Sequence, residues 1–436
     1  MLEEKFVNFY KKIIFKKVKE KGWFYVIRKL ALRLFTVNVI IIYPIIFFFC
    51  LIIKLIKPIV FIRFGALNSD RFGLLAAIPE LNLCEQEAGI QPNKNKTINI
   101  YNNGHTSFVS NSKLLDMWSR VIRIYPKSRY FWNIMNTFSF GKEHIIETTF
   151  HTRDIHGLLE NTKSHLVFSK NEIQEGKEQL SNMGISEQDK YVLMINRGDK
   201  FLKEGYIPGK NIDFSYHSYR NSNINDYLPM AEMLTAKGNF VIRMGHLVSD
   251  LMKTKNPKII EYDKGGYRTE LLDIYLAAHC RYIIGSDTGY LAMPGWVFRK
   301  PIVFVNFSQL NYIEPFLSSW IIIFKKYWLK KENRFLKINE ILESGVGKFN
   351  RTEEFQQKGI EVINNTPEEI LDATDEMENR LNGTWKDSID DEKLQKRFWS
   401  YFESKNNPGF FKPKYNSGII KGRIGSRFLR SAQELF

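Results

Sequence analysis

The chain alternates short apolar runs, rich in β-branched and aromatic residues, with longer amphipathic stretches. The apolar runs predict strands, and the amphipathic stretches predict helices. The predicted strands cover residues 58–63, 97–101, 121–125, 190–196, 239–244, 258–262, 281–284 and 301–306. The predicted helices include residues 111–120, 172–183, 224–236, 270–279, 367–382 and 390–403. This alternation predicts an α/β fold whose mostly parallel sheets are covered on both faces.

The same pattern divides the 436 residues into two α/β units of similar size. We predict an N-terminal domain at 58–189 and a C-terminal domain at 190–345, both within the usual size range of a domain. Residues 1–57 are predicted to form a segment that associates with a membrane. Residues 346–436 are predicted to form two polar helices and a basic tail.

The segment Leu34–Ile53 contains 20 residues without a charge, enough for a helix to match the thickness of a bilayer core. It predicts membrane contact, with a buried core helix or strand pair as the alternative. Both flanks are basic, and Pro44 would kink a helix near its middle. A re-entrant or monotopic dip therefore fits better than a straight span. A chain without residues 1–57 should then leave the membrane with both α/β units still folded.

The net charge of +16 lies mainly at the two ends. Residues 1–33 carry ten lysines and arginines and three glutamates, and their apolar residues recur near helical spacing. This pattern predicts a basic amphipathic helix on an anionic membrane surface. Residues 405–436 carry seven basic residues and one glutamate. A nucleic-acid binder would more often spread basic and aromatic residues over a folded face, so we expect no nucleic-acid partner.

The cysteines and histidines predict neither a disulfide framework nor a metal site. The three cysteines, Cys50, Cys84 and Cys280, are far apart in sequence, which favours a reducing compartment. Four histidines occur between residues 144 and 165 without tight metal-ligand spacing, and His151 and His156 miss the i, i+4 pattern. We therefore predict no bound metal.

The predicted strand 281–284 runs into Gly285, Ser286, Asp287, Thr288 and Gly289, ahead of a predicted helix. Backbone N–H groups at a helix N-terminus bind phosphate oxygens, and Ser or Thr hydroxyls add donors. In parallel sheets, ligands lie beyond the carboxyl ends of the strands. The loop therefore predicts a phosphate site, with a plain helix N-cap formed by Asp287 or Thr288 as the alternative.

With Ala292, Gly295, Lys300 and Pro301, this segment resembles the donor-site segment of GT-B glycosyltransferases. It is closest in form to the heptosyltransferase-like enzymes. The segment from Phe64 to Pro79 resembles the first-strand loop of the same enzymes. Two departures stand out: Pro294 interrupts the donor-side helix, and Leu74 stands where a polar catalytic residue is expected.

Residues 58–310 are also similar to bacterial glycosyltransferases of surface-polysaccharide gene clusters. Three elements stand in the same order: Arg71-Phe72-Gly73, Tyr219-Arg220-Asn221 and the loop 285–289. The resemblance implies a GT-B fold, with two Rossmann-like domains facing a cleft. The first domain would bind the acceptor and the second a nucleotide-sugar donor. No cofactor or metal would be needed, because the nucleotide sugar is a co-substrate.

Sugar transfer requires stabilisation of the negative charge on the leaving phosphate and removal of a proton from the acceptor hydroxyl. Without a metal, arginines must stabilise the charge on the leaving phosphate. We expect Arg220 and Arg243 to do so and Arg197 to bind the donor in the same cleft. Asp70 is the expected general base. The structural alternatives are a solvated loop for Arg220, a sheet-edge salt bridge for Arg243 and a helix N-cap for Asp70.

These patterns together predict a glycosyltransferase on the cytoplasmic face of the bacterial inner membrane, in cell-surface polysaccharide biosynthesis. The membrane segment and the basic ends favour a lipid-linked glycan acceptor. Two alternatives are a sugar-nucleotide epimerase of the same fold and a non-enzymatic membrane-associated scaffold. Nucleotide binding would exclude the scaffold, and dependence on a lipid acceptor would exclude the epimerase.

Overall fold

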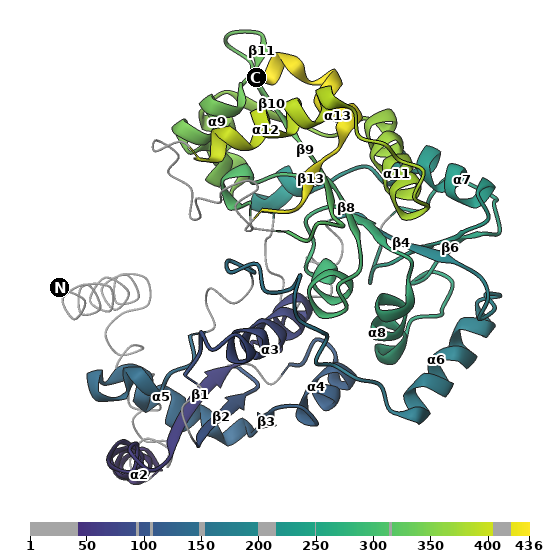
Figure 1. Ribbon diagram of the computed structural model, residues 1–436. Helices are drawn as coiled ribbons and strands as arrows, with labels where there is room; N and C mark the ends of the chain where they lie inside the picture. Colours follow the sequence, from purple (N-terminus) through teal and green to yellow (C-terminus); the bar gives the residue numbers. More distant parts are fainter. Residues whose placement is uncertain are drawn as a thin grey trace, which may run out of the picture. The chain divides into compact units, whose positions relative to one another are not determined.

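The computed structural model describes residues 42–92, 96–104, 108–147, 153–198, 215–248, 250–313, 316–403 and 420–436 (Figure 1). Contacts divide the chain into two compact units. Unit 1 comprises Met1–Ala66, Asn93–Asn102 and Arg123–Glu147, and unit 2 comprises Leu67–Pro92, Asn103–Ile122 and Thr148–Phe436. The predicted boundaries after residues 57, 189 and 345 differ from this division and stay a prediction.

Unit 1 is built on a small parallel sheet in the order β1-β2-β3. Its strands are β1 (Phe61–Ala66), β2 (Thr97–Asn102) and β3 (Arg123–Ile124), so the three strand predictions hold within a few residues. Helices α2 (Tyr43–Leu55) and α5 (Arg129–Thr137) and the 3-10 helix η3 (Ser139–His144) pack beside one another. The segment that contains α5 and η3 has no clear period, and the sequence did not predict its helices.

Helix α2 packs on the core of unit 1 with one side, as in the core-helix alternative for Leu34–Ile53, and the predicted membrane contact of residues 1–57 stays a prediction. Its Cys50 is fully buried in a cluster with Phe64, Ile134 and Met135. Pro44 lies in the first turn of α2, where a missing N–H costs nothing, and so does not kink it. Residues 34–41 lie outside the described residues. Within the described part of the chain, none of the helices combines the length and apolar character needed to cross a bilayer.

Unit 2 contains a seven-stranded parallel sheet in the order β13-β9-β8-β7-β4-β5-β6. The first six strands in sequence are β4 (Tyr191–Ile195), β5 (Phe240–Arg243), β6 (Ile259–Glu261), β7 (Ile283–Gly285), β8 (Ile302–Phe307) and β9 (Ile321–Phe324). Strands β4 to β9 have the order of a doubly wound Rossmann sheet, with the reversal between β4 and β7. The α/β prediction is thereby confirmed for this unit.

Helices cover both faces of this sheet. Figure 1 shows α7 (Leu228–Ala236) and α11 (Pro367–Leu381) on one face and α8 (Glu270–His279) on the other. Helix α8 contacts α4 (Ser112–Ser119) and α6 (Lys170–Asn182), while α3 (Phe72–Glu87) contacts the chain that follows β7. At the first turn of α4, the N–H groups of Ser112 and Lys113 donate to the Glu270 carboxylate over 3.1 Å. These contacts place α3 and α4 in unit 2.

A second, antiparallel sheet follows β9, in the order β11-β10-β12. It consists of β10 (Lys326–Leu329), β11 (Arg334–Phe335) and β12 (Ile360–Ile363), and the connections hold α9 (Ile338–Ser344) and α10 (Thr352–Gln357). The sequence analysis assigned no elements to this region. Its strands are only two to four residues long, too short to give a clear hydrophobic period.

The predicted basic tail is folded where the structure describes it. After α12 (Ile389–Glu403), strand β13 (Arg423–Ile424) pairs with β9, and α13 (Ser426–Ser431) packs on α11 and α12. Arg423, Arg427 and Arg430 form ion pairs with carboxylates of the fold. These three charges are therefore part of unit 2, and residues 404–419 lie outside the described residues.

Candidate functional site

A cavity of about 1130 Å³ opens at the carboxyl ends of the parallel strands, entirely within unit 2. Residues that follow β4, β5, β7 and β8 line it, among them Arg197, Gly245, Thr288 and Gln309. The strand order reverses between β4 and β7, and in open parallel sheets this is where ligands bind. The predicted phosphate loop therefore lies at the expected edge of the sheet.

The Arg71-Phe72-Gly73 element lies directly against the 285–289 loop. A Cβ atom added to Gly73 would lie 2.6 Å from the carbonyl oxygen of Gly289 and 2.7 Å from its Cα. Only glycine lets two backbones approach this closely. The rings of Phe72 and Tyr290 stack beside this contact, with centroids 5.5 Å apart. Two elements that are over 200 residues apart in sequence thus form one wall of the cavity.

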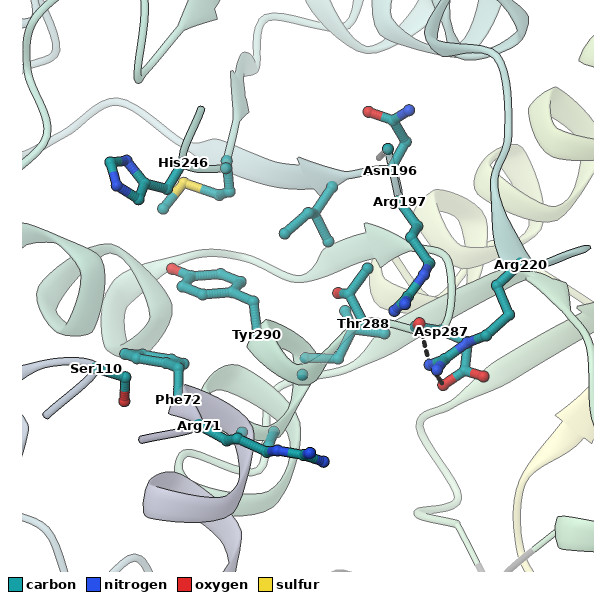
Figure 2. Close-up of a pocket in the computed structure, with 18 of the residues that line it drawn as sticks. Arg71, Phe72, Ser110, Asn196, Arg197, Arg220, His246, Asp287, Thr288 and Tyr290 are labelled. Atoms are coloured by element: carbon teal, nitrogen blue, oxygen red, sulfur yellow. Dashed lines mark hydrogen bonds and ion pairs between the residues drawn. The ribbon is translucent and has the colours of Figure 1, made fainter. Parts of the chain in front are cut away.

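The third element joins them through Arg220. Its Nη2 donates to the backbone carbonyl of Asp287 over 2.6 Å and lies 3.0 Å from the Asp287 carboxylate. Figure 2 shows the side chains of Arg197 and Arg220 extending toward Asp287 and Thr288. The three elements on which the resemblance rests therefore meet in a single cavity. The Arg220 guanidinium is held in place rather than solvated, which removes the alternative of a solvated loop.

Thr288 is one of the residues that line this cavity, and its buried hydroxyl has no hydrogen-bond partner among the described residues. It stands at the N-cap position of the 3-10 turn η7 (Gly289–Leu291) but makes no cap hydrogen bond. A buried hydroxyl usually finds a partner. Thr288 is therefore placed to bond a ligand, and the alternative of a plain helix cap does not describe this loop.

The chain after Gly289 corrects the prediction of a helix. It forms η7 and a single π-helical turn, η8 (Met293–Val297), instead of an α-helix. Pro294 lies in the first turn of η8 and Gly295 packs against Ile302 and Trp320. Without a regular helix, little macrodipole acts at this loop. Anion binding here must depend on side chains and individual N–H groups.

Gly285 and Ser286 support the loop and do not line the cavity. Ser286 is fully buried, and its Oγ accepts a hydrogen bond of 2.9 Å from the backbone N–H of Arg197. Its own N–H donates to the carbonyl of Ile195 over 3.2 Å. Ser286 thus ties the ends of β4 and β7 together and positions Arg197.

Arg243 lines the cavity but is already paired. Its Nη1 lies 3.1 Å from both carboxylate oxygens of Glu261 on β6 and donates to the backbone carbonyl of Asp250. Its Nη2 lies 3.4 Å from the Asn196 side-chain oxygen. This is the salt bridge that the sequence analysis left as the alternative. Glu261 offsets the charge of Arg243, which leaves less of it to neutralise a phosphate. Arg243 instead holds the loop after β5 in place through the carbonyl of Asp250.

Basic side chains gather around Asp287. Burial lowers the pKa of His217 to about 4, and the nearby charges of Arg220 and Arg197 add to the effect. Burial also lowers the pKa of Lys325 to about 7, against the attraction of Asp287. Asp287 is the carboxylate that faces Arg220. Two arginines and a buried lysine around one carboxylate form an electrostatic environment that favours an anion.

Lys325, at the end of β9, holds the loop that carries Arg220. Its side chain is 1% exposed, and its Nζ donates to the carbonyl oxygens of Tyr219 and Asn221 over 2.7 and 2.8 Å. These carbonyls lie on either side of Arg220. Sequence reasoning missed this residue. The available signal was a lysine directly after the apolar run 320–324, where a buried charge is costly unless it has a role.

Two carboxylates are placed to act as a base. Asp70 lines the cavity just before Arg71, and it is not the helix cap because Arg71 occupies the N-cap position of α3. Asp273, in the first turn of α8, also lines the cavity. Burial raises the pKa of Asp273 to about 6, although Arg268 lies 2.9 Å away and opposes the shift. A pKa near neutrality is what a general base needs.

Glu80, Cys84 and His165 are near enough to one another to share a metal ion, but a cation is already among them. The Arg299 guanidinium lies 2.7 Å from the Glu80 carboxylate and 3.3 Å from Cys84 Sγ. Burial lowers the pKa of His165, but hydrogen bonds to Cys84 and Glu80 outweigh it and raise the value to about 10. A protonated imidazole cannot bind a metal. We interpret the group as an ion network that holds α3 in place.

Comparisons with known proteins give structural neighbours but no sequence match. No protein-family model matches the chain, and no curated protein matches it. A family 9 glycosyl transferase from Veillonella parvula aligns with a TM-score of 0.36 and 13% identity over 61% of this chain and 86% of its own. The ADP-heptose lps heptosyltransferase II of E. coli aligns with a TM-score of 0.38 and 11% identity over 74% and 100%.

A dodecameric, iron-containing heptosyltransferase, TibC, aligns with a TM-score of 0.28 and 10% identity over 56% of this chain and 57% of its own. Two of these three neighbours are heptosyltransferases, and the third is a family 9 glycosyl transferase. Their TM-scores are below 0.5, so we derive the function from the residues of the site instead. Metal-independent transfer stays a prediction for this chain.

Proposed function

We propose that the chain is a glycosyltransferase that moves a sugar from a nucleotide-sugar donor to a hydroxyl of a glycan acceptor. The observation that carries the proposal is the convergence of Arg197, Arg220 and the unpaired hydroxyl of Thr288 at the strand-order reversal. These groups suit a phosphate, because guanidinium groups and hydroxyls donate to its oxygens. A cavity of 1130 Å³ has room for a nucleotide sugar.

In the proposed reaction, the acceptor oxygen bonds to the anomeric carbon while the bond from that carbon to the donor phosphate breaks. The proton of the acceptor hydroxyl goes to a carboxylate, and the electron pair of the broken bond stays on the phosphate. Arg197 and Arg220 stabilise the charge that develops there, and Thr288 donates to it. Asp70 is the proposed base, with Asp273 as the second candidate.

The acceptor and the location are proposed on the sequence. We propose a lipid-linked glycan acceptor at the cytoplasmic face of the bacterial inner membrane, in the biosynthesis of a cell-surface polysaccharide. The basic residues among 1–33 support contact with anionic lipid. The proposal needs no cofactor or metal, since arginines supply the charge.

The donor site is tested by thermal shift of the purified chain with a panel of nucleotides and nucleotide sugars. A ligand that binds only the native state raises its melting temperature. Thr288→Val should weaken donor binding about tenfold, the expected loss of one hydrogen bond to a charged group. Arg220→Lys should lower turnover roughly 10²–10³-fold, because an ammonium cannot reproduce the guanidinium contacts. Thr137→Val, at an exposed threonine of unit 1, is the matched control.

Replacing each carboxylate by its amide identifies the base. If Asp70 is the base, Asp70→Asn loses transfer and keeps donor binding, while Asp273→Asn retains most activity. The reverse result assigns the role to Asp273. Wild-type donor affinity and turnover in both Thr288→Val and Arg220→Lys would place the donor site elsewhere and overturn the proposal.

A further inference from the structure

Helix α2 is apolar on both of its sides, but only one side is covered by described residues. The side that carries Cys50 packs into the core of unit 1, with Phe47 and Ile53 beside it. The opposite side carries Ile45, Phe48 and Leu55, which are 51%, 61% and 77% exposed. A helix that is hydrophobic all round normally has both sides buried. We therefore expect the outer side of α2 to bind a partner that covers it.

The exposed apolar residues are concentrated in one short stretch. Six of the fourteen large exposed apolar side chains in the described part of the chain lie between residues 45 and 59: Ile45, Phe48, Phe49, Leu51, Leu55 and Ile59. Residues 45, 48, 52 and 55 follow the i, i+3, i+4 spacing of one face of α2. We call the exposed side chains of Ile45, Phe48, Phe49, Leu51 and Leu55 the outer face of α2. Single exposed apolar residues are normal, but a contiguous set marks an interaction site.

We propose that the outer face of α2 inserts into the surface of an anionic lipid bilayer, with the helix lying in the plane of the membrane. At 13 residues, α2 is about 20 Å long, shorter than the roughly 30 Å core of a bilayer. A helix that lies in the interface buries its apolar face 5–10 Å deep, roughly the reach of a phenylalanine or leucine side chain. The inner side of α2 meanwhile keeps its contacts with α5.

Charge favours lipid over another protein as the partner. Seven basic side chains of the described residues of unit 1 reach its surface: Lys54, Lys57, Lys96, Arg123, Lys127, Arg129 and Lys142. The same described residues contain only two acidic side chains, Glu143 and Glu147. The sequence before α2 adds a net charge of +7 over residues 1–33. A second copy of the chain would bring two such positive surfaces together, whereas anionic headgroups complement them.

The test uses a label whose signal comes from α2 itself. The three native cysteines are buried, so Phe48→Cys offers one exposed thiol for an environment-sensitive dye. Ile389→Cys, at a 79% exposed site in unit 2, is the matched control. Full-length protein is mixed with vesicles of phosphatidylglycerol and phosphatidylcholine, or of phosphatidylcholine alone. The dye at 48 should brighten several-fold and shift to the blue with anionic vesicles, and the dye at 389 should not change.

Partitioning of unlabelled protein provides a second measurement. Phe48→Glu with Leu55→Glu should weaken sedimentation with anionic vesicles at least about tenfold, since two large apolar side chains no longer enter the lipid. Ile389→Glu should bind like the wild type. Neither experiment depends on transferase activity, so its result is separate from that of the proposed function.

Two outcomes would overturn the inference. One is vesicle binding in which the dye at residue 48 stays in water and the double glutamate variant binds like the wild type. The other is a dimer in solution that the double variant converts to monomers without loss of vesicle binding, which would assign the outer face of α2 to a second copy of the chain. Light scattering after size-exclusion chromatography distinguishes this case.

Discussion

The position of Arg220 at the candidate site depends on Lys325, a residue that does not line the cavity. Its ammonium group binds the carbonyls of Tyr219 and Asn221 and so orients the loop that carries Arg220. Thr352 contributes from α10, with its Oγ1 3.2 Å from the N–H of Tyr219. The backbone on both sides of Arg220 is thus held in place before any ligand arrives. A site arranged in advance loses less entropy on binding.

Lys325→Met tests this role and gives a pH dependence with a definite sign. The pKa of Lys325 is about 7 in the folded chain and about 10.4 when unfolded. Between these values the unfolded chain binds more protons, so the lysine destabilises the fold most below pH 7, and this penalty fades as the pH rises. The free energy of unfolding of the wild type, minus that of Lys325→Met, should therefore rise by about 1 kcal/mol per pH unit above pH 7.

Urea unfolding of both proteins at several pH values between 7 and 9 measures this difference. The same variant should lower turnover about tenfold, because Arg220 loses its support. A difference in stability that stays flat over this range would show that the pKa of Lys325 is not depressed.

The close backbone contact between Gly73 and Gly289 predicts the effect of a substitution at Gly73. In Gly73→Ala the new Cβ would overlap the backbone of Gly289, which cannot move away as a flexible side chain would. We expect a loss of about 1–3 kcal/mol in the free energy of unfolding, together with weaker donor binding. Denaturant titration and thermal shift with the donor measure the two effects.

Gly89→Ala, at the other end of the same helix, separates stability from binding. Gly89 has a φ of +69° with open space around it, so alanine strains the backbone without touching the site. It should lower stability by about 1 kcal/mol and leave donor affinity unchanged. Equal donor affinities in Gly73→Ala and the wild type would show that the loop tolerates displacement.

At the scale of elements, α2 shows why removal of the N-terminal segment is more harmful than the sequence suggests. A chain that begins at residue 58 lacks the helix that covers Phe64, Ile134 and Met135. We expect this truncated chain to be insoluble or to lose the cooperative melting of unit 1, because several large apolar side chains lose their cover. A chain that begins at residue 42 keeps α2 and should melt cooperatively.

Calorimetry of the two truncated chains makes the comparison. If the chain that begins at residue 58 melts as cooperatively as the longer one, α2 is not part of the folded core.

At the scale of the whole molecule, the described arginines of the C-terminal end are paired within the fold. Arg430 lies 2.7 Å from Asp391, which is almost fully buried, and Arg427 pairs with Asp372 and Asp375. Arg427→Gln with Arg430→Gln should therefore lower the melting temperature, since a buried carboxylate loses its partner. Vesicle sedimentation should change less than about twofold, because these charges serve the fold and not the lipid.

Lys16→Gln with Lys17→Gln is the matched pair from the N-terminal end. It should weaken vesicle binding, more at low salt than at high salt, and leave the melting temperature unchanged. If the C-terminal pair reduced vesicle binding as much as the N-terminal pair, both ends would contribute to lipid contact.

The sequence alone determined the strands β1 to β8 of the two parallel sheets within a few residues, whereas β9 to β13 were not predicted. Helix α8 has the predicted bounds, 270–279, because its apolar period and its Thr269 cap are local features. The sequence also showed three short motifs and their order along the chain: Arg71-Phe72-Gly73, Tyr219-Arg220-Asn221 and the 285–289 loop. A local pattern is enough to predict a helix or a strand. The hydrogen bonds of a helix join residues four positions apart, and side chains alternate between the two faces of a strand.

Only the tertiary structure decided which of these residues act together. The contact of Gly73 with Gly289, the pairing of Arg243 with Glu261 and the support from Lys325 join residues that are far apart in sequence. No local pattern contains such distances. An apolar run likewise has the same period in a core as at a membrane, so the sequence could not show that α2 packs on α5 with one side. Packing in three dimensions separates these cases, because it determines which side chains lose contact with water.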